Sequence, residues 1–253
     1  MSRFDLSGKV ALVTGASRGI GSAIAHAMVE QGAQVVLSSR KQADLDEEAA
    51  RINAEYPEAA TAIAAHAGRP DDLERLVGAV MKRFSRIDIL VNNAATNPAI
   101  GPVLGADLAA WDKTFEVNLR GMFILTKLVY EASMEAHGGS VVNVASVGGL
   151  RPGLGLGVYN ITKAGVIMFT RQLAREIGGK VRVNAVAPGL IKTRFAEALW
   201  GNEAILDRVL AVNPMGRIGV PEEVASAVVF LASDAASYIN GEVVVIDGGG
   251  GEI

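Results

Sequence analysis

Cysteine is absent from this sequence of 253 residues, which excludes disulfide bonds, thiolate metal sites and cysteine nucleophiles. Histidine is scarce: His26 and His137 have no acidic or histidine neighbours at ligand spacing, so we predict no metal site. Redox chemistry in this chain would therefore need a bound organic cofactor, and the lack of cysteine suits a reducing compartment.

A dominant charge and a long apolar run are lacking as well. The 24 basic and 27 acidic residues are scattered and give a net charge of −3, which argues against nucleic acid as a partner. No run of ~18 apolar residues occurs, and no basic segment leads into an apolar stretch at the N-terminus. We expect a cytoplasmic protein with no membrane partner.

Short runs rich in β-branched residues alternate with stretches of helical length, and half of the residues (50%) are hydrophobic. Parallel strands need long crossovers, and helices in those crossovers cover both faces of a sheet. The pattern predicts one α/β domain over residues 1–253, a doubly wound parallel sheet between two helical layers. The predicted strands are 10–14, 34–38, 61–65, 87–92, 140–144, 181–187 and 242–246, and the predicted helices are 20–31, 43–56, 71–84, 111–137, 158–177 and 221–232.

A glycine-rich turn joins the first strand to the first helix through Gly15, Gly19 and Gly21. Glycines let the backbone turn tightly and approach a pyrophosphate, while the first amides of the following helix attract the anion. The G-x-x-x-G-x-G spacing differs from the better-known dinucleotide and phosphate-loop fingerprints, and an ordinary tight turn is the alternative. The strand–turn–helix context favours a dinucleotide site.

The end of the second strand indicates which nicotinamide cofactor binds. An acidic residue there would hold a ribose 2′-hydroxyl, but the chain has Ser39, Arg40 and Lys41 after Ser38. Arginine and serine can hydrogen-bond to a 2′-phosphate, and Arg18 could approach it from the glycine turn. We predict NADP(H) rather than NAD(H), the alternative being that Arg40 and Lys41 form only a solvated helix entrance.

Tyr159 and Lys163 are four residues apart, hence on one face of a predicted helix. A phenol is a poor base at neutral pH, but a nearby cation favours the phenolate and lowers the phenol pKa. Ser146 follows the strand at 140–144, where its hydroxyl could bind a substrate oxygen and the phenol. A serine hydrolase is excluded, because Ser146 lacks the preceding glycine of G-x-S-x-G and no histidine follows it.

Together these motifs resemble the short-chain dehydrogenase/reductase family along essentially the whole chain. The matching residues are Thr14-Gly15 through Gly21, Asn92-Asn93-Ala94, Asn118, Ser146, Tyr159 with Lys163, and Pro188-Gly189. The resemblance implies a seven-stranded Rossmann-type sheet of order 3-2-1-4-5-6-7. It also implies a homotetramer formed through the long helices and the C-terminal strand.

The resemblance implies catalytic roles for four residues. Tyr159 would be the general acid and base, Ser146 would polarise the carbonyl, Lys163 would lower the phenol pKa and hold ribose hydroxyls, and Asn118 would support a proton relay. The implied cofactor-binding residues are Gly15, Ser17, Arg18, Gly19, Ile20, Gly21, Ser39, Arg40, Lys41, Asn92, Ala94, Tyr159, Lys163, Pro188, Gly189, Ile191 and Thr193.

Two positions depart from the family pattern. Ala95 stands where a glycine is common, and His66 stands where many members have an aspartate beside adenine. His66 could contact adenine, or it could be a surface histidine without function. We therefore leave His66 out of the predicted site.

The predicted function is hydride transfer between NADP(H) and a small ketone or dicarbonyl, or the corresponding alcohol. One alternative is a 3-oxoacyl-carrier-protein reductase, although the segment 130–137 lacks the basic residues that would receive an acidic carrier. A non-catalytic NADP sensor is the other alternative, and the intact tetrad argues against it. Substrate contacts should come from 96–103, 147–158 and 190–214, where Phe195, Leu199 and Trp200 could form a lid or pack on another subunit.

Overall fold

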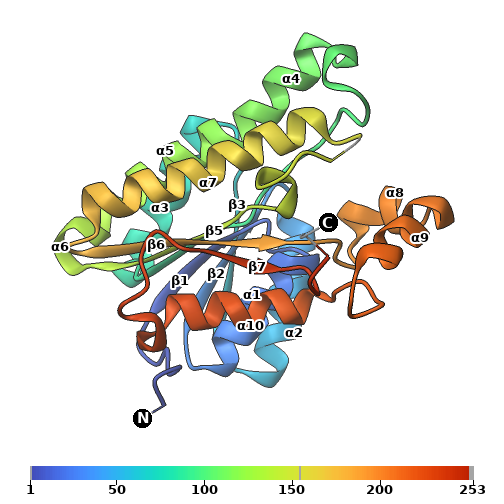
Figure 1. Ribbon diagram of the computed structural model, residues 1–253. Coiled ribbons are helices and arrows are strands. Elements are labelled where there is room, and N and C mark those ends of the chain that lie inside the picture. Colours follow the sequence, from blue (N-terminus) through green and yellow to red (C-terminus); the bar gives the residue numbers. More distant parts are fainter. Residues whose placement is uncertain (1, 154, 251–253) are drawn as a thin grey trace.

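A computed structural model describes residues 2–153 and 155–250. Within these residues, seven parallel strands form one sheet in the order β3-β2-β1-β4-β5-β6-β7, as predicted (Figure 1). The strands are β1 (Val10–Thr14), β2 (Gln34–Ser39), β3 (Ala60–Ala64), β4 (Ile89–Asn92), β5 (Gly139–Val144), β6 (Val181–Pro188) and β7 (Val243–Ile246).

Helices cover both faces of the sheet: α1, α2 and α10 lie on one face, and α3 to α7 lie on the other (Figure 1). Because both faces are covered, the central strands are almost entirely apolar, and Leu12, Val36 and Leu90 are fully buried. The helices are α1 (Gly19–Glu30), α2 (Gln42–Glu55), α3 (Pro70–Phe84), α4 (Leu108–Phe115), α5 (Gly121–Val129), α6 (Glu135–His137), α7 (Gly157–Ile177), α8 (Glu197–Trp200), α9 (Glu203–Val212) and α10 (Pro221–Ala232).

The long helix predicted at 111–137 differs most from the structure. It begins at Leu108, because the Asp107 side chain accepts the N–H of Ala110 at 2.7 Å and caps the helix there. Two π-helical segments, Glu116–Arg120 and Tyr130–Met134, divide it into α4, α5 and α6. Such wide turns often occur at functional sites, and the first one contains Asn118.

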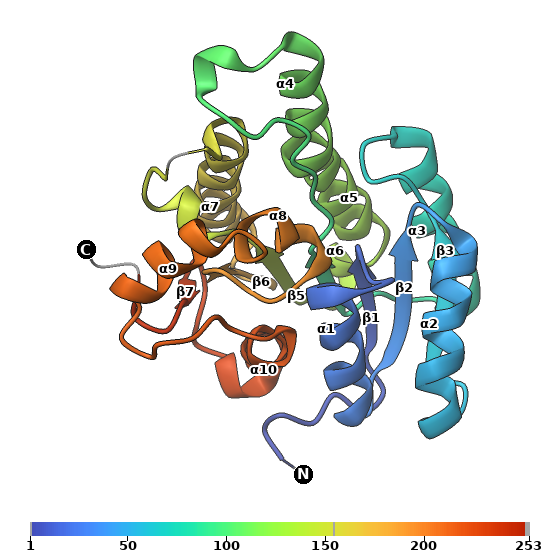
Figure 2. The same cartoon turned by 90° about the vertical axis from the view of Figure 1, so that its right-hand side faces the viewer.

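The strand order reverses between β1 and β4, and a crevice is expected beyond the carboxyl ends of the strands at that point. Figure 2 looks onto this edge of the sheet, where α8 and α9 lie in front of the strands.

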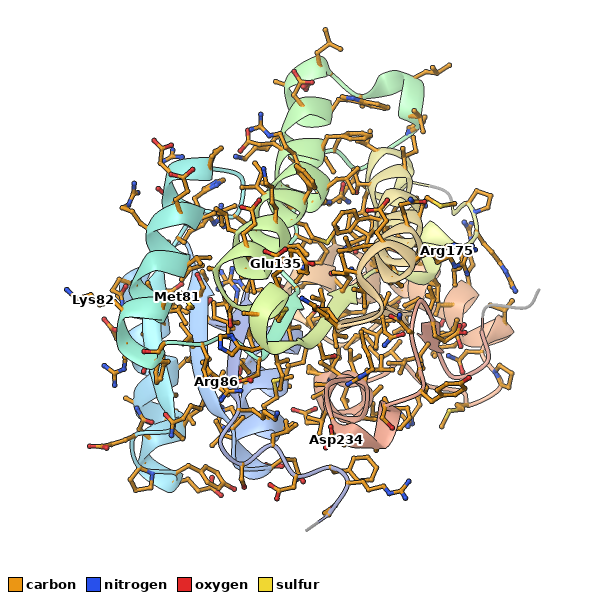
Figure 3. All side chains as sticks on the ribbon, turned by 90° about the vertical axis from the view of Figure 1, so that its left-hand side faces the viewer. Met81, Lys82, Arg86, Glu135, Arg175 and Asp234 are labelled. Carbon is orange, nitrogen blue, oxygen red and sulfur yellow. The ribbon has the colours of Figure 1, made fainter. Side chains whose placement is uncertain are left out.

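Figure 3 shows the opposite side of the molecule, with Lys82 and Arg175 among its labelled side chains. In the described part of the chain, no helix is long and apolar enough to cross a bilayer.

Candidate active site

A cavity of about 1670 Å³ runs along the carboxyl edge of the sheet. It exceeds the roughly 300–1,000 Å³ of an ordinary ligand pocket, which suits a dinucleotide together with a substrate. Its wall contains most of the predicted site residues: Gly15, Ser17, Arg18, Gly19, Ile20, Ser39, Arg40, Lys41, Ala94, Ser146, Tyr159, Lys163, Pro188, Gly189, Ile191 and Thr193. The fold thus gathers segments that are far apart in the sequence.

The glycine turn depends on close backbone approach. A Cβ on Gly21 would lie 2.4 Å from the carbonyl oxygen of Gly15, so only glycine lets α1 pack against the turn. Asn93 donates from Nδ2 to the carbonyl oxygens of Thr14 and Gly15 at 2.8 and 3.2 Å. Gly21 therefore shapes the turn from behind and does not line the cavity.

The N-terminus of α1 opens beside this turn. The N-cap of α1, Arg18, makes no side-chain capping bond. The first backbone N–H groups of the helix, which have no partner within the helix, therefore receive no hydrogen bond from the cap side chain. Gly19 has a φ of +61° and lies opposite Thr193. A Cβ built on Gly19 would lie 3.4 Å from Thr193 Cγ2. A pyrophosphate placed between these two segments would meet helix N–H donors, so the residues present fit a dinucleotide.

The end of β2 provides the cationic residues on the adjoining wall. Ser39, Arg40 and Lys41 all line the cavity, and the two cationic side chains are exposed. Asp44, in the first turn of α2, lines the same part of the cavity. Two cations and a serine hydroxyl can hold a phosphate here despite one nearby carboxylate.

His66 and Lys113 are cavity residues that the sequence analysis left out. Lys113 Nζ lies 3.2 Å from His66 Nε2 and donates to Glu116 Oε1 at 2.8 Å, while His66 Nδ1 lies 3.0 Å from the backbone N of Gly68. Burial, followed by the charge of Lys113, lowers the pKa of His66. No spacing in the sequence relates positions 66 and 113, because α4 meets the segment after β3 only in the folded chain.

Tyr159 lies in the first turn of α7, and burial raises its pKa to about 12, although a hydrogen bond with Ser146 acts in the opposite direction. Ser146 follows β5, and its own hydroxyl accepts the N–H of Gly148 at 3.2 Å. Both hydroxyl groups therefore lie on the cavity wall, close enough for Ser146 to influence the pKa of Tyr159. A carbonyl oxygen placed against them could receive two hydrogen bonds.

Lys163 is only 3% exposed, and its Nζ donates to the carbonyl oxygen of Val144 at 2.6 Å and lies 5.4 Å from the centre of the Tyr159 ring. Burial lowers the pKa of Lys163 to about 8. The spacing led us to expect a lowered pKa for Tyr159, whereas this arrangement raises it. The reason is that burial of the phenol outweighs other influences and that the ammonium group is directed at a backbone carbonyl.

Asn118 and Asn92 lie behind the cavity wall. Asn118 is 2% exposed; its side chain accepts the N–H of Thr96 at 2.8 Å and donates to the Thr96 carbonyl at 2.9 Å. Asn92 donates to Thr126 Oγ1 at 3.0 Å and to Asn143 Oδ1 at 2.9 Å. Asn118 holds the segment that follows β4, Asn92 joins the end of β4 to β5 and α5, and neither amide lines the cavity.

Asn160, another residue absent from the predicted site, packs against Gly148 in the turn that follows Ser146. It is 7% exposed, and its Oδ1 would lie 2.1 Å from a Cβ built on Gly148. Its Nδ2 makes a long contact of 3.4 Å with the Gly153 carbonyl oxygen. The missing side chain at position 148 therefore lets α7 and the turn pack together.

We expect Gly148→Ala to destabilise the protein by about 1–3 kcal/mol, because the new methyl group overlaps a buried amide. Adding Asn160→Ala should recover part of that loss, giving a coupling energy of about 1 kcal/mol or more. Urea unfolding of the wild type, both single variants and the double variant measures the coupling. Strict additivity of the two changes would contradict this packing arrangement.

Comparison with known proteins agrees with this site. A family model described as "Enoyl-(Acyl carrier protein) reductase" matches residues 15–250. The chain is 43% identical over 248 residues to the rabbit (Oryctolagus cuniculus) dehydrogenase/reductase SDR family member 4, covering 98% of this chain and 95% of that protein. The chain belongs to the short-chain dehydrogenase/reductase family and is an NAD(P)-dependent oxidoreductase acting on alcohol or carbonyl groups.

Two solved structures are similar along almost the whole chain. Levodione reductase superposes with a TM-score of 0.92 at 35% identity, covering 97% of this chain and 98% of its own. A protein from Beutenbergia cavernae assigned as an NAD(P)-dependent gluconate 5-dehydrogenase, solved with NADP at low occupancy, gives a TM-score of 0.92 at 35% identity and 98% coverage of both chains.

Proposed function

We propose that this protein reduces a ketone or dicarbonyl with NADPH, or oxidises the corresponding alcohol with NADP⁺. The observation that carries the proposal is the shared cavity: Tyr159 and Ser146 lie on one part of its wall, and Arg40 and Lys41 lie on another. The glycine turn connects these two parts. A cofactor held along this wall would bring its nicotinamide to the Tyr159 end.

In the proposed mechanism, the nicotinamide, when bound, supplies or accepts the hydride. The Ser146 hydroxyl donates a hydrogen bond to the substrate carbonyl oxygen and holds it against Tyr159. The Tyr159 hydroxyl gives its proton to that oxygen as negative charge develops there, which is general acid catalysis. Lys163 stabilises the phenolate that remains, and Asn118 positions the Thr96 segment beside the reacting groups.

NADP(H) is the proposed cofactor because of the charges after β2. A 2′-phosphate would accept hydrogen bonds from Arg40 and Ser39, with Arg18 approaching from the turn. Gly15, Gly19 and Ile20 would cradle the pyrophosphate, while Ile191 and Thr193 would hold the carboxamide. The NADP bound to the Beutenbergia protein supports this choice by similarity.

A 3-oxoacyl-carrier-protein reductase is the second candidate, and the family model's description supports it only by naming a carrier protein, because an enoyl reductase reduces a C=C bond. The segment that would receive an acidic carrier carries Glu131 and Glu135, both exposed, which disfavours docking. A screen of NADPH oxidation over ketones, dicarbonyls, quinones, sugars and acetoacetyl thioesters separates the candidates. We expect turnover of ketones or dicarbonyls. Activity on thioesters alone would favour the second candidate, and absence of activity on every substrate would favour a non-catalytic NADP sensor.

The two reaction directions should differ in their pH dependence. Because the pKa of Tyr159 is raised to about 12, the phenol keeps its proton near neutral pH and is ready to act as an acid. Alcohol oxidation requires the phenolate, whose fraction rises with pH. We expect kcat/KM for oxidation to rise up to roughly pH 8 and then level off, whereas reduction stays level and then falls above about pH 8, because Lys163, which stabilises the phenolate, loses its charge there. An oxidation profile that falls below about pH 8 would contradict this assignment.

We also propose a homotetramer. Large apolar side chains are exposed on the outer surface of α4, α5 and α7, namely Leu108, Phe123, Ile161 and Met168, and β7 exposes Val245 at the sheet edge. The helical surface and the β7 edge can each pack against the same surface of another copy about a two-fold axis, and the two contacts together close an assembly of four chains. Light scattering should give a four-chain mass, and Phe123→Glu with Met168→Glu should reduce it to two chains or one. A tetramer that persists in this variant would exclude the helical surface as an interface.

A further inference from the structure

Two arginines line the cavity apart from the cationic residues after β2. Arg151 follows the Ser146 turn and Arg194 follows Thr193; both are exposed and both belong to the cavity wall. Over residues 2–153 and 155–250, neither guanidinium forms an ion pair with a carboxylate. Two arginines without a carboxylate partner among the described residues therefore line the cavity, and the proposed chemistry already has its cation in Lys163.

The backbone that carries Arg151 is held in place. Its N–H donates to the carbonyl oxygen of Val147 at 3.0 Å, and the N–H of Gly149 donates to the Ser146 carbonyl at 2.9 Å. Gly149 packs so closely on α7 that a Cβ there would lie 2.6 Å from the carbonyl carbon of Lys163. The Ser146 hydroxyl and the Arg151 side chain thus project from one short, well-packed turn.

The backbone that carries Arg194 is also held, and its neighbours show where it lies. The indole Nε1 of Trp200 donates to the carbonyl oxygen of Thr193 at 2.8 Å. On the other side of Arg194, the ring of Phe195 lies 6.1 Å from the ring of Tyr159, centre to centre. In the sequence, Arg194 therefore lies between Thr193, which is proposed to hold the carboxamide, and Phe195, whose ring lies beside that of Tyr159.

Carboxylates on the cavity wall do not neutralise this end. Asp247 Oδ1 accepts the N–H of Gly249 at 2.9 Å, and Asp44 lies near Arg40 at the start of α2. Apolar residues close to the two arginines in sequence, Leu150, Phe195 and Leu199, also line the cavity. An apolar pocket with two guanidiniums selects a small organic anion, because arginine matches a carboxylate with paired N–H donors.

We propose that the substrate is an oxo acid, or the corresponding hydroxy acid, whose carboxylate is bound by Arg151 and Arg194. This inference rests on the proposed function. In the reduction, the substrate carbonyl carbon receives the hydride of NADPH and its oxygen receives the Tyr159 proton, so that a hydroxy acid and NADP⁺ form. The carboxylate takes no part in the bond changes and serves to orient the carbonyl group.

The test compares oxo acids with their methyl esters, which differ in charge and retain the reacting ketone. With the wild type, we expect kcat/KM for at least one acid to exceed that of its ester by about tenfold or more at low ionic strength. In Arg151→Gln/Arg194→Gln, the acid should lose about tenfold or more while the ester changes less than about threefold. Arg175→Gln, on the side of the molecule shown in Figure 3, is the matched control and should leave both rates unchanged.

A binding measurement separates failure of this inference from failure of the proposed function. Calorimetry with a hydroxy acid and the enzyme saturated with NADP⁺ should show binding that the double variant loses and the Arg175→Gln control keeps. Turnover of esters in preference to acids, or an acid-to-ester ratio unchanged in the double variant, would overturn the inference and leave ketone reduction standing. Absence of turnover with both substrate types would overturn the proposed function, and calorimetry would then decide on the anion site by itself. A double variant that instead raises KM for NADPH alone would assign the arginines to the cofactor and overturn the inference.

Discussion

Tyr159→Phe is expected to lower kcat for carbonyl reduction by about 10³-fold or more while leaving cofactor binding nearly unchanged. The substitution removes one oxygen atom and keeps the ring, so the contacts with Phe195 and Lys163 can persist. General acid catalysis contributes roughly 10²–10⁴-fold, and here the same group also donates a hydrogen bond to the developing alkoxide. Steady-state rates of NADPH oxidation, together with NADPH fluorescence titration, measure the two effects separately.

Tyr238→Phe is the matched control, because Tyr238 is fully exposed and lies outside the cavity wall. It should retain wild-type turnover. Near wild-type turnover in Tyr159→Phe would overturn the proposed proton donor. Loss of NADPH binding in that variant, with unchanged thermal unfolding, would show instead that the hydroxyl serves the cofactor.

Arg40→Asp is expected to reverse the cofactor preference by about 100-fold or more in kcat/KM. The change removes a charge-assisted hydrogen bond to the 2′-phosphate, worth about 1.5–3 kcal/mol, and adds a carboxylate that repels the phosphate. The same carboxylate can accept a hydrogen bond from the 2′-hydroxyl of NADH, so activity with NADH should be kept or improved. Rates with NADPH and NADH at several concentrations give the preference.

Lys82→Asp provides the control for a general change of charge. Lys82 is exposed on α3 and lies on the side of the molecule opposite the cavity (Figure 3). We expect it to leave the ratio of the NADPH and NADH rates unchanged. An equal loss with both cofactors in Arg40→Asp would mean that Arg40 supports the local fold, and a wild-type preference for NADH would refute the proposed cofactor.

Prediction from sequence worked best where one local pattern decides the structure. The glycine turn before α1 was predicted because Gly15, Gly19 and Gly21 follow a strand and precede a helical pattern directly. It worked least well at 111–137, where an apolar helical pattern does not show that the backbone widens into π-helical turns. The segment at 190–214 was expected to hold the carboxamide, to supply substrate contacts and to form a lid or a subunit contact. Its helices α8 and α9 bury none of their residues, and α9 begins at the Asn202 cap.

The sequence by itself determined the family, through the resemblance of its motifs. It also determined the alternation of strands and helices and the pairing of Tyr159 with Lys163 on one helix face, because both follow from spacing along the chain. Only the tertiary structure decided which way the pKa of Tyr159 moves, since burial comes from segments remote in sequence. It also decided that Lys113 meets His66, that Asn160 supports Gly148, and that Arg151 and Arg194 share one cavity. Such contacts arise because the parallel sheet brings the ends of distant strands to a single edge.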